Sequence, residues 1–247
     1  MSALLEVCNV TKRFGGVIAN DRLSLKVQKG EIVGLIGPNG SGKSTLFGCI
    51  AGAFPIDEGE ILFEDLPLSH LRVRPIARLG LIRTYQQTRI YGKMSCLENM
   101  RISARDAQGN VFRLLTAQAR ATDARANELL EFVGLYEKRL HEAGRLSFGQ
   151  QKLLEFAMAL MSEPKLLLLD EPTAGINPML INDLMNRLKQ ANRDFGISLL
   201  IIEHNMEVIM NLAQHIICLA HGRILAAGKP EDVRNDSHVL DAYLGAQ

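Results

Sequence analysis

The sequence lacks the cysteine patterns that build disulfide frameworks or zinc sites. Its four cysteines, Cys8, Cys49, Cys96 and Cys218, are scattered over 247 residues, with no Cys-x-x-Cys pair and no histidine nearby at ligand spacing. Small secreted domains pair their cysteines, and structural zinc sites space their ligands closely. We therefore expect reduced, structural thiols, as is usual for a cytosolic protein.

An excess of charge and long apolar runs are also missing. Lys and Arg number 28 and Asp and Glu 27, so the formal net charge of +1 creates no overall field to attract nucleic acid or an anionic membrane. The longest apolar runs, such as residues 166–169 and 199–202, have the length of strands and not of a membrane-spanning helix. No basic and apolar leader opens the sequence. We expect neither a signal peptide nor a transmembrane segment, so that any membrane role would need a partner protein.

The sequence does contain an alternation of strand and helix patterns. Its 247 residues are enough for one large domain or for a core with a subdomain. Residues 4–10 and 21–28 alternate apolar and polar positions and predict two antiparallel strands. Short buried strands are predicted at residues 31–36, 165–169 and 197–202, and helical patterns follow them. This alternation predicts an α/β sheet that binds its ligands at the carboxyl ends of its strands.

The segment from about residue 95 to 161 differs in composition from its surroundings and has a helical pattern, with apolar residues in two runs at helical spacing. We expect a helical subdomain here, inserted into a core formed by about residues 1–94 and 162–247. The pattern from about residue 66 to 96 is irregular.

The most informative stretch is residues 37–44, Gly-Pro-Asn-Gly-Ser-Gly-Lys-Ser, which lies between a predicted strand and a predicted helix. Its glycines let the backbone curl so that successive N–H groups point at one anion, and the helix N-terminus adds partial positive charge. Lys43 is expected to reach the β- and γ-phosphates of a nucleotide, and the Ser44 hydroxyl to hold Mg²⁺. An ordinary glycine-rich turn capped by serine is the alternative, but the strand before and the helix after favour a nucleotide site.

Two adjacent carboxylates, Asp170 and Glu171, follow four leucines at the end of a predicted strand. Neighbouring side chains of a strand point in opposite directions, so the two carboxylates should do different work. Where such a phosphate loop is present, an aspartate at this position helps to hold Mg²⁺. The glutamate after it can polarise an attacking water. A solvated acidic turn is the alternative, which the phosphate loop disfavours.

Four further features carry weaker signals. Residues 146–150, Leu-Ser-Phe-Gly-Gln, open a predicted helix, where the Ser147 hydroxyl is either an anion contact or only a cap. Gln86 lies on a predicted loop and offers an amide ligand for Mg²⁺ or water, or is a surface glutamine. His204 follows a buried strand and could orient the attacking water, or is a structural histidine. Phe14 offers a face for stacking adenine, or is a core residue beside a turn.

With these pieces in this order, the chain resembles the nucleotide-binding subunit of an ABC transporter over essentially its whole length. The motifs correspond to the aromatic loop at Phe14, the Walker A loop at residues 37–44, the Q-loop at Gln86, the signature at residues 146–150, the Walker B strand at residues 166–171, the D-loop at residues 174–177 and the switch histidine at His204. Several stretches, among them residues 13–16, 83–86 and 242–245, are similar to the ATP-binding subunits of branched-chain amino-acid and urea or amide importers. The insertion at about residues 104–125 suits the longer of that family's two ATPase types.

Two positions depart from the usual ABC pattern. Phe148 stands where the signature commonly has glycine, and Asn177 stands where the D-loop commonly has aspartate. Relatives within the resembled subfamily also carry an aromatic residue and an asparagine there. No catalytic position is missing, so the resemblance implies an active ATPase.

The resemblance implies the ABC ATPase fold, in which an α/β P-loop NTPase core carries an antiparallel β subdomain and an inserted α-helical subdomain. The implied cofactors are ATP and Mg²⁺. The implied nucleotide contacts are Phe14, Gly37, Pro38, Asn39, Gly40, Ser41, Gly42, Lys43, Ser44, Thr45, Ser147, Gly149 and Gln150. The implied Mg²⁺ ligands are Ser44, Gln86 and Asp170, and the implied catalytic residues are Glu171, His204 and Lys43.

The resemblance also implies partners. Two ATP-binding subunits, either identical or paralogous, would enclose two ATP molecules, each between the Walker A loop of one and the signature of the other. Transmembrane permease subunits would bind the pair at the cytoplasmic face of the membrane, and a solute-binding protein would act indirectly. No nucleic-acid partner is implied.

The expected function is ATP hydrolysis that drives solute uptake, with branched-chain amino acids favoured and urea, amides or another solute as alternatives. A soluble ABC ATPase of repair or translation usually has two nucleotide units or long coiled-coil or basic insertions, which this chain lacks. A non-hydrolysing regulatory module is opposed by the intact Lys43, Asp170, Glu171 and His204. A kinase is disfavoured because no acceptor besides water has an evident site.

Overall fold

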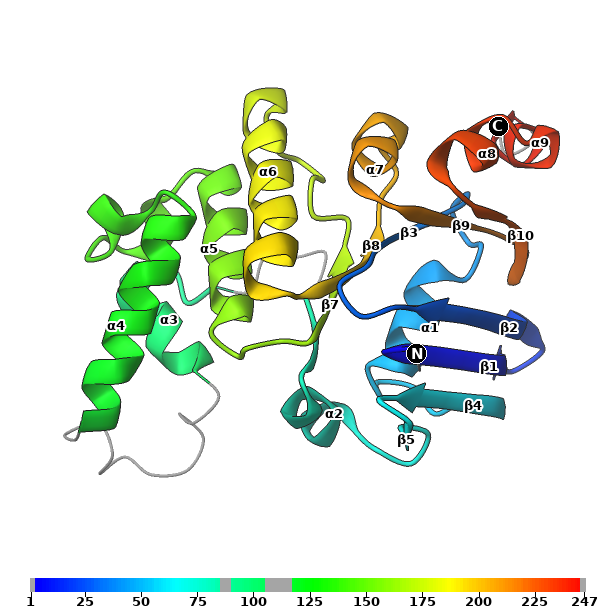
Figure 1. The fold of residues 1–247 in the computed structure, drawn as a ribbon, viewed down its shortest axis with the longest axis horizontal. Helices are drawn as coiled ribbons and strands as arrows, with labels where there is room; N and C mark the ends of the chain where they lie inside the picture. The colour runs from blue at the N-terminus through cyan, green and yellow to red at the C-terminus, as the bar shows by residue number, and fades with distance from the viewer. Residues whose placement is uncertain (1–2, 85–89, 105–116, 245–247) are drawn as a thin grey trace. The chain divides into compact units, whose positions relative to one another are not determined.

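The computed structural model describes residues 3–84, 90–104 and 117–244, whose fold is shown in Figure 1. By their internal contacts these residues divide into two compact units. The first unit comprises residues 1–83, 165–172 and 189–247, and the second comprises residues 84–164 and 173–188. The division falls within helix α6 (Pro178–Phe195), which therefore belongs to both.

The first unit is built on a six-stranded sheet with the strand order β10-β9-β3-β8-β7-β6. Its strands are β3 (Ile32–Ile36), β6 (Leu81–Arg83), β7 (Leu166–Asp170), β8 (Ser198–Ile202), β9 (His215–Ala220) and β10 (Arg223–Gly228). Neighbours from β9 to β6 pair in parallel, and β10 pairs with β9 in the antiparallel sense. Strands β3, β7 and β8 are buried along their whole length, as is usual for parallel strands covered on both faces.

A second sheet of the first unit is antiparallel, with the order β2-β1-β4-β5. Its strands are β1 (Leu5–Phe14), β2 (Val17–Val27), β4 (Glu58–Phe63) and β5 (Leu66–Pro67). Helix α1 (Lys43–Ile50) contributes Leu46, Phe47 and Ile50 to one apolar core that contains residues of both sheets. The predicted antiparallel strands and α/β sheet are confirmed.

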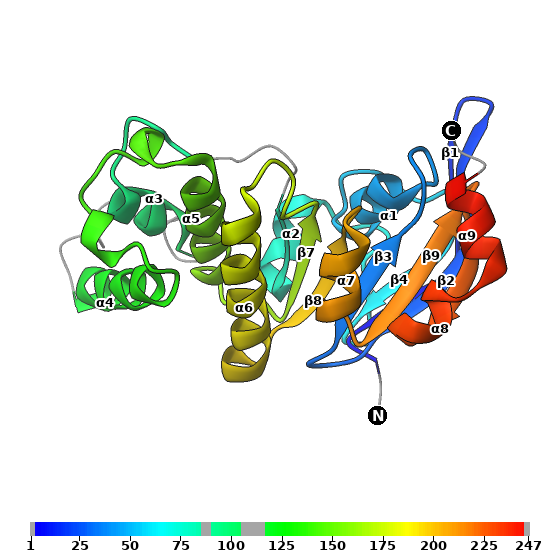
Figure 2. The same cartoon turned by 90° about the horizontal axis from the view of Figure 1, so that it is seen from above.

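Three C-terminal helices contact the six-stranded sheet. Helix α7 (Met206–Leu212) contacts β3, helix α8 (Pro230–Arg234) contacts β9 and β10, and helix α9 (Ser237–Leu244) contacts β10. Figure 1 shows these helices above the strands of the six-stranded sheet, and in Figure 2 α7 lies over β8 and β3 while α8 and α9 lie beside β9. The last helices thereby return the end of the chain to the sheet whose strand β3 precedes residues 37–42.

Residues 66–96, whose sequence pattern is irregular, form regular elements in the structure. The stretch contains β5, helix α2 (Val73–Leu79) and the edge strand β6, and helix α3 (Cys96–Ser103) begins at its end. Strand β6 has three residues and α2 has seven, so neither is long enough to repeat a period of two or 3.6 residues. What makes β6 a strand is its parallel pairing with β7, which is a distant part of the sequence.

The second unit is helical. It contains α3, α4 (Ala117–Phe132), α5 (Phe148–Leu160), the start of α6 and the short 3₁₀ helices Tyr136–Lys138 and Ala143–Arg145. Leu129 and Leu130 of α4 and Leu154 and Leu160 of α5 are buried, and they are members of the two apolar runs in the sequence. Capping boxes fix the first turns of α3 and α5.

The cysteines are free thiols, as predicted, and Cys49, Cys96 and Cys218 are buried while Cys8 is half-buried. Burial raises the pKa of the Cys49 and Cys218 thiols to about 11, so both stay protonated at neutral pH. Within the described part of the chain, no helix has the length and apolarity needed to cross a membrane.

Candidate functional site

Four neighbouring parallel strands of the first unit bring polar groups to one edge of the sheet. Residues 37–42 follow β3, His204 lies beyond β8, Glu171 directly follows β7 and His221 directly follows β9. Because β9, β3, β8 and β7 are adjacent and parallel, the groups beyond their carboxyl ends lie close together. The sheet therefore builds a site from separate parts of the sequence.

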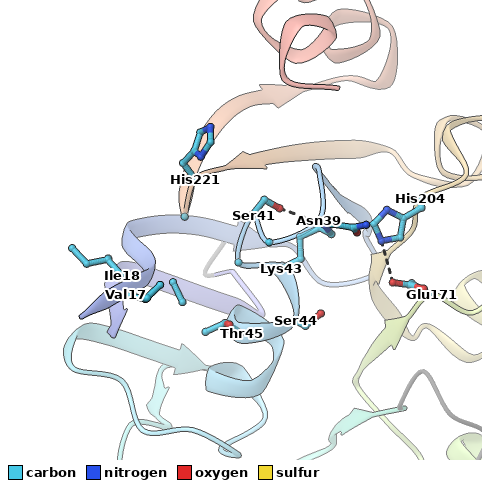
Figure 3. Close-up of a pocket in the computed structure, with 14 residues that line it drawn as sticks. Val17, Ile18, Asn39, Ser41, Lys43, Ser44, Thr45, Glu171, His204 and His221 are labelled. Carbon is cyan, nitrogen blue, oxygen red and sulfur yellow. Dashed lines mark hydrogen bonds and ion pairs between the residues drawn. The ribbon is translucent and has the colours of Figure 1, made fainter. Parts of the chain in front are cut away.

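Most of these groups line a cavity of about 440 Å³, shown in Figure 3, whereas Gly37 and Pro38 are not among its lining residues. Its lining consists of Val17, Ile18, Ala19, Asn39, Gly40, Ser41, Gly42, Lys43, Ser44, Thr45, Glu171, His204, His221 and Gly222. Sites for small molecules usually have volumes of about 300–1,000 Å³. One end of the cavity is apolar at Val17 and Ile18, and the other carries Glu171 and His204.

Lys43 lies at the start of α1 and is held by the loop that precedes it. Its ammonium group donates to the carbonyl oxygens of Gly37 and Pro38 at 2.8 and 2.9 Å and to the Ser41 hydroxyl at 3.3 Å. Burial lowers the pKa of Lys43, and the negative charges of Glu171 and Asp170 act in the opposite direction. The loop of residues 37–42 thus holds the Lys43 ammonium group by oxygen atoms at the N-terminus of α1.

Glu171 and His204 form a pair at the edge of the cavity. The His204 Nε2 atom lies 3.0 Å from the Glu171 Oε1 atom (Figure 3). The backbone N–H groups of both residues are hydrogen-bonded. The Glu171 N–H donates to the Ile202 carbonyl oxygen at 2.9 Å, and the His204 N–H donates to the Glu203 carboxylate at 2.9 Å. A carboxylate and an imidazole in contact can orient a water molecule and accept a proton from it.

Asp170, the carboxylate before Glu171, makes a different interaction. Its Oδ2 atom accepts from the Arg83 Nη2 atom at 2.7 Å, and the two side chains are only 7% and 11% exposed. Arg83 ends strand β6, which pairs with β7, and its guanidinium group also lies 5.7 Å from the centre of the Phe47 ring. The two carboxylates thus have different partners, and the roles predicted for them stay predictions.

We expect Arg83→Met to lower the free energy of unfolding by about 3 kcal/mol, because it leaves a buried carboxylate without its cation. Urea unfolding followed by circular dichroism measures the change. The double variant with Asp170→Asn should recover more than half of that loss, since no buried charge is then left unpaired. A single variant as stable as the parent, or a double variant as unstable as the sum of the two single ones, would contradict the ion pair.

The residues that could hold Mg²⁺ offer hard oxygen donors, which this ion prefers. Ser44 lines the cavity, and the Asp170 carboxylate, with one oxygen on Arg83, ends strand β7, which β8 separates from β3. Within the described residues, no group of three or more His, Cys, Asp and Glu side chains could hold a metal ion. The donor set therefore fits an ion that takes most of its ligands from phosphates and water. Gln86, the third predicted ligand, lies outside the described residues.

Phe14 is not among the residues that line the cavity. It ends β1, is 45% exposed, and packs edge-to-face on Phe54, with ring centres 5.4 Å apart. The Lys12 ammonium group lies 5.2 Å from the centre of its ring. Its stacking on adenine stays a prediction. The apolar end of the cavity is instead formed by Val17 and Ile18, which the sequence did not single out.

The predicted signature residues lie in the second unit, at the start of α5. Ser147 is the N-cap: its hydroxyl accepts from the Gln150 N–H at 3.4 Å, and the Gln150 side chain accepts from the Ser147 N–H at 3.2 Å. Gly149 lies against α6, and a Cβ atom there would be 2.5 Å from the Leu180 Cδ1 atom. Phe148 stays half-exposed beside them. The capping role anticipated as an alternative for Ser147 is therefore present, and contact with nucleotide stays a prediction.

Comparison with known protein families gives two matches. The model described as "ABC transporter" matches residues 20–174, and the model described as "Branched-chain amino acid ATP-binding cassette transporter" matches residues 223–247. The first covers most of the cavity-lining residues. The second covers the end of the chain, including strand β10 and helices α8 and α9.

Curated proteins with similar sequences align over nearly the whole chain. The chain is 37% identical to the probable branched-chain amino acid transport ATP-binding protein LivG of Archaeoglobus fulgidus, over 99% of this chain and 96% of that protein. It is also 37% identical to the high-affinity branched-chain amino acid transport ATP-binding protein BraF of Pseudomonas aeruginosa, over 98% of each.

Solved structures share the fold. The ADP conformation of MJ1267, an ATP-binding cassette of an ABC transporter, superposes with a TM-score of 0.87 at 32% identity, over 99% of this chain and 100% of that one. MJ0796, described as a dimeric post-hydrolysis state bound to ADP and Pi, gives a TM-score of 0.78 at 26% identity, over 92% of this chain and 98% of that one.

Proposed function

The chain belongs to the ABC transporter family and, within it, to the branched-chain amino acid transport ATP-binding proteins, and on this basis we propose that it powers the uptake of branched-chain amino acids. The assignment of the cargo rests on similarity to whole relatives and to a family model. Relatives named for this transport align end to end, and residues 223–247 match the model of the branched-chain amino acid cassettes. The cavity itself does not select the cargo, because the solute is bound by other subunits in such importers.

As an ABC transporter ATPase, the chain binds and hydrolyses ATP. We assign the phosphates to the loop of residues 37–45, with Lys43 neutralising their charge and the N-terminus of α1 pointing at them. Mg²⁺, held by Ser44, Asp170 and Gln86, would supply further positive charge when bound. The contact of Lys43 with three loop oxygens supports this assignment, because the ammonium group is already aimed at the loop's interior.

We assign the hydrolytic step to Glu171 and His204. The Glu171 carboxylate would accept a proton from the attacking water, and His204 would orient Glu171 and contact the γ-phosphate. The 3.0 Å contact between the two side chains at the edge of the cavity supports this arrangement. Catalysis of phosphoryl transfer is mostly positioning and charge stabilisation, which a rigid sheet edge provides.

A second ATP-binding subunit, identical or paralogous, would complete each site. Its signature residues, Ser147, Gly149 and Gln150, would face the nucleotide from the opposite side, as the N-terminus of α5 is a suitable anion contact. A dimeric arrangement is described for MJ0796. Permease subunits would hold the pair at the cytoplasmic face of the membrane and work with a solute-binding protein.

Reconstitution tests the cargo. The chain is purified from membranes with its permease, reconstituted in liposomes with the accompanying solute-binding protein, and assayed for ATP hydrolysis with leucine, isoleucine, valine, urea or acetamide. We expect the branched-chain amino acids to stimulate hydrolysis at least about fivefold over urea and acetamide. Stimulation by urea or acetamide alone would overturn the cargo assignment, and hydrolysis without any solute dependence would overturn the importer.

A further inference from the structure

The last helix of the described chain contacts the phosphate loop through one hydrogen bond. The Gly37 N–H donates to the Tyr243 hydroxyl at 2.8 Å, across 206 positions of sequence. Tyr243 belongs to α9, which packs on β10, and Gly37 follows β3 directly. Both residues belong to the first unit. The contact therefore links the C-terminal segment to the first residue of the phosphate loop.

Gly37 is held on both sides of its Cα atom. Its N–H is bound by Tyr243, and its carbonyl oxygen accepts from the Lys43 ammonium group at 2.8 Å. Its φ of 141° lies in the region that favours glycine, and a Cβ atom there would be 2.1 Å from the Leu219 carbonyl oxygen. Gly37 is thus tied through its nitrogen to Tyr243 and through its oxygen to Lys43, at a position that has no space for a side chain.

The chemistry of the Tyr243 hydroxyl suits a permanent contact. Burial raises the pKa of Tyr243 to about 12, so the hydroxyl stays neutral at physiological pH, and its oxygen accepts from the Gly37 amide. Gly37 is buried, so its N–H has little access to water that could replace the tyrosine. Cys218 is close enough to Tyr243 and to Lys43 to influence the pKa of each if its thiol were charged, which places all three in one neighbourhood.

We propose that Tyr243 is a positioning residue for nucleotide binding: through Gly37 it fixes the carbonyl that anchors Lys43, so that helix α9 sets the affinity of the phosphate loop. The C-terminal segment thereby acts on ATP without touching it. This inference rests on the proposed role of residues 37–45 in phosphate binding, and it adds a residue that lies outside the cavity lining.

The test compares Tyr243→Phe with the parent protein and with Tyr136→Phe, a half-buried tyrosine of the second unit that serves as the matched control. Phenylalanine keeps the ring and removes only the hydroxyl. The dissociation constant of Mg²⁺-ADP is measured by displacement of a fluorescent ADP analogue. Loss of one buried hydrogen bond corresponds to an affinity change of about fivefold. We expect that rise for Tyr243→Phe, a raised KM for ATP with kcat kept within about twofold, and no change for Tyr136→Phe.

Hydrogen exchange of the Gly37 amide, followed by NMR, gives a second readout that reports the bond itself. We expect faster exchange in Tyr243→Phe than in the parent protein. A merely structural role would lower the melting temperature and leave the dissociation constant unchanged, and an unchanged dissociation constant overturns the proposal whatever the exchange rate. Lys43→Ala separates failure of this inference from failure of the phosphate-loop assignment. If Lys43→Ala loses ADP binding while Tyr243→Phe does not, only this inference fails. If both variants bind ADP normally, the phosphate-loop assignment fails as well.

Discussion

Glu171→Gln is expected to lower the rate of ATP hydrolysis at least about 100-fold, because the amide cannot accept the proton of the attacking water. The substituted amide would keep the size of the side chain and a hydrogen bond to His204, which now lies 3.0 Å from the Glu171 carboxylate. Nucleotide affinity should change by less than about threefold, since the loop of residues 37–45 is untouched. ATP would bind and not be consumed.

Glu171→Gln should also change the oligomeric state of the protein in the presence of ATP. If two subunits close over ATP, the variant should accumulate as an ATP-bound dimer, measured by size-exclusion chromatography with light scattering. Glu163→Gln is the matched control, because Glu163 is exposed and has a φ of 49°, close to the 51° of Glu171. Parent-like turnover in Glu171→Gln would rule out the assigned base, and loss of turnover in both variants would point to the backbone conformation instead.

Lys43→Ala is expected to weaken binding of Mg²⁺-ATP by about 100-fold and to abolish measurable hydrolysis. Charge-assisted hydrogen bonds contribute about 1.5–3 kcal/mol each, and a factor of 100 requires about 2.8 kcal/mol. In this structure the ammonium group donates to Gly37, Pro38 and Ser41, so truncation also leaves the loop without its central donor. Isothermal titration with Mg²⁺-ATP measures the affinity.

Folding of the variant has to be shown separately, because Lys43 is itself buried. Lys43→Met keeps most of the side-chain volume and should lose affinity equally while retaining the far-ultraviolet circular dichroism of the parent. Lys229→Ala is the control, since Lys229 is exposed and its side chain makes no capping hydrogen bond to α8. Normal ATP turnover in a folded Lys43→Met protein would contradict the assignment of the phosphate site.

The parts of the site that the sequence predicted are those that are local in the chain. Lys43 and Ser44 stand within eight consecutive residues with a strand on one side and a helix on the other, so their spacing alone gives their geometry. Asp170 and Glu171 follow a run of leucines, so their place at the end of β7 was predictable, but Glu171 lies beyond the strand with a φ of 51° and its direction does not follow from the period of two. The family resemblance, now confirmed by the comparisons, extended this to the fold and the ATPase activity.

The parts that the sequence missed depend on which strands are neighbours. Arg83 meets Asp170 only because the three-residue strand β6 pairs with β7, and His221 reaches the cavity only because β9 lies beside β3. Tyr243 reaches Gly37 from the far end of the chain. Strand order is a property of the folded sheet, and no periodicity in the sequence encodes it.

The position of β3 in the middle of its sheet has a consequence for protein synthesis. On the ribosome the phosphate loop emerges early, but β3 pairs only with β8 and β9, which are translated more than 160 residues later. Until they arrive, both edges of an apolar strand stay unpaired, a state that invites aggregation and that chaperones protect. A nascent chain that ends before β8 therefore contains residues 37–44 in full, but strand β3, which precedes them, has no strand to pair with.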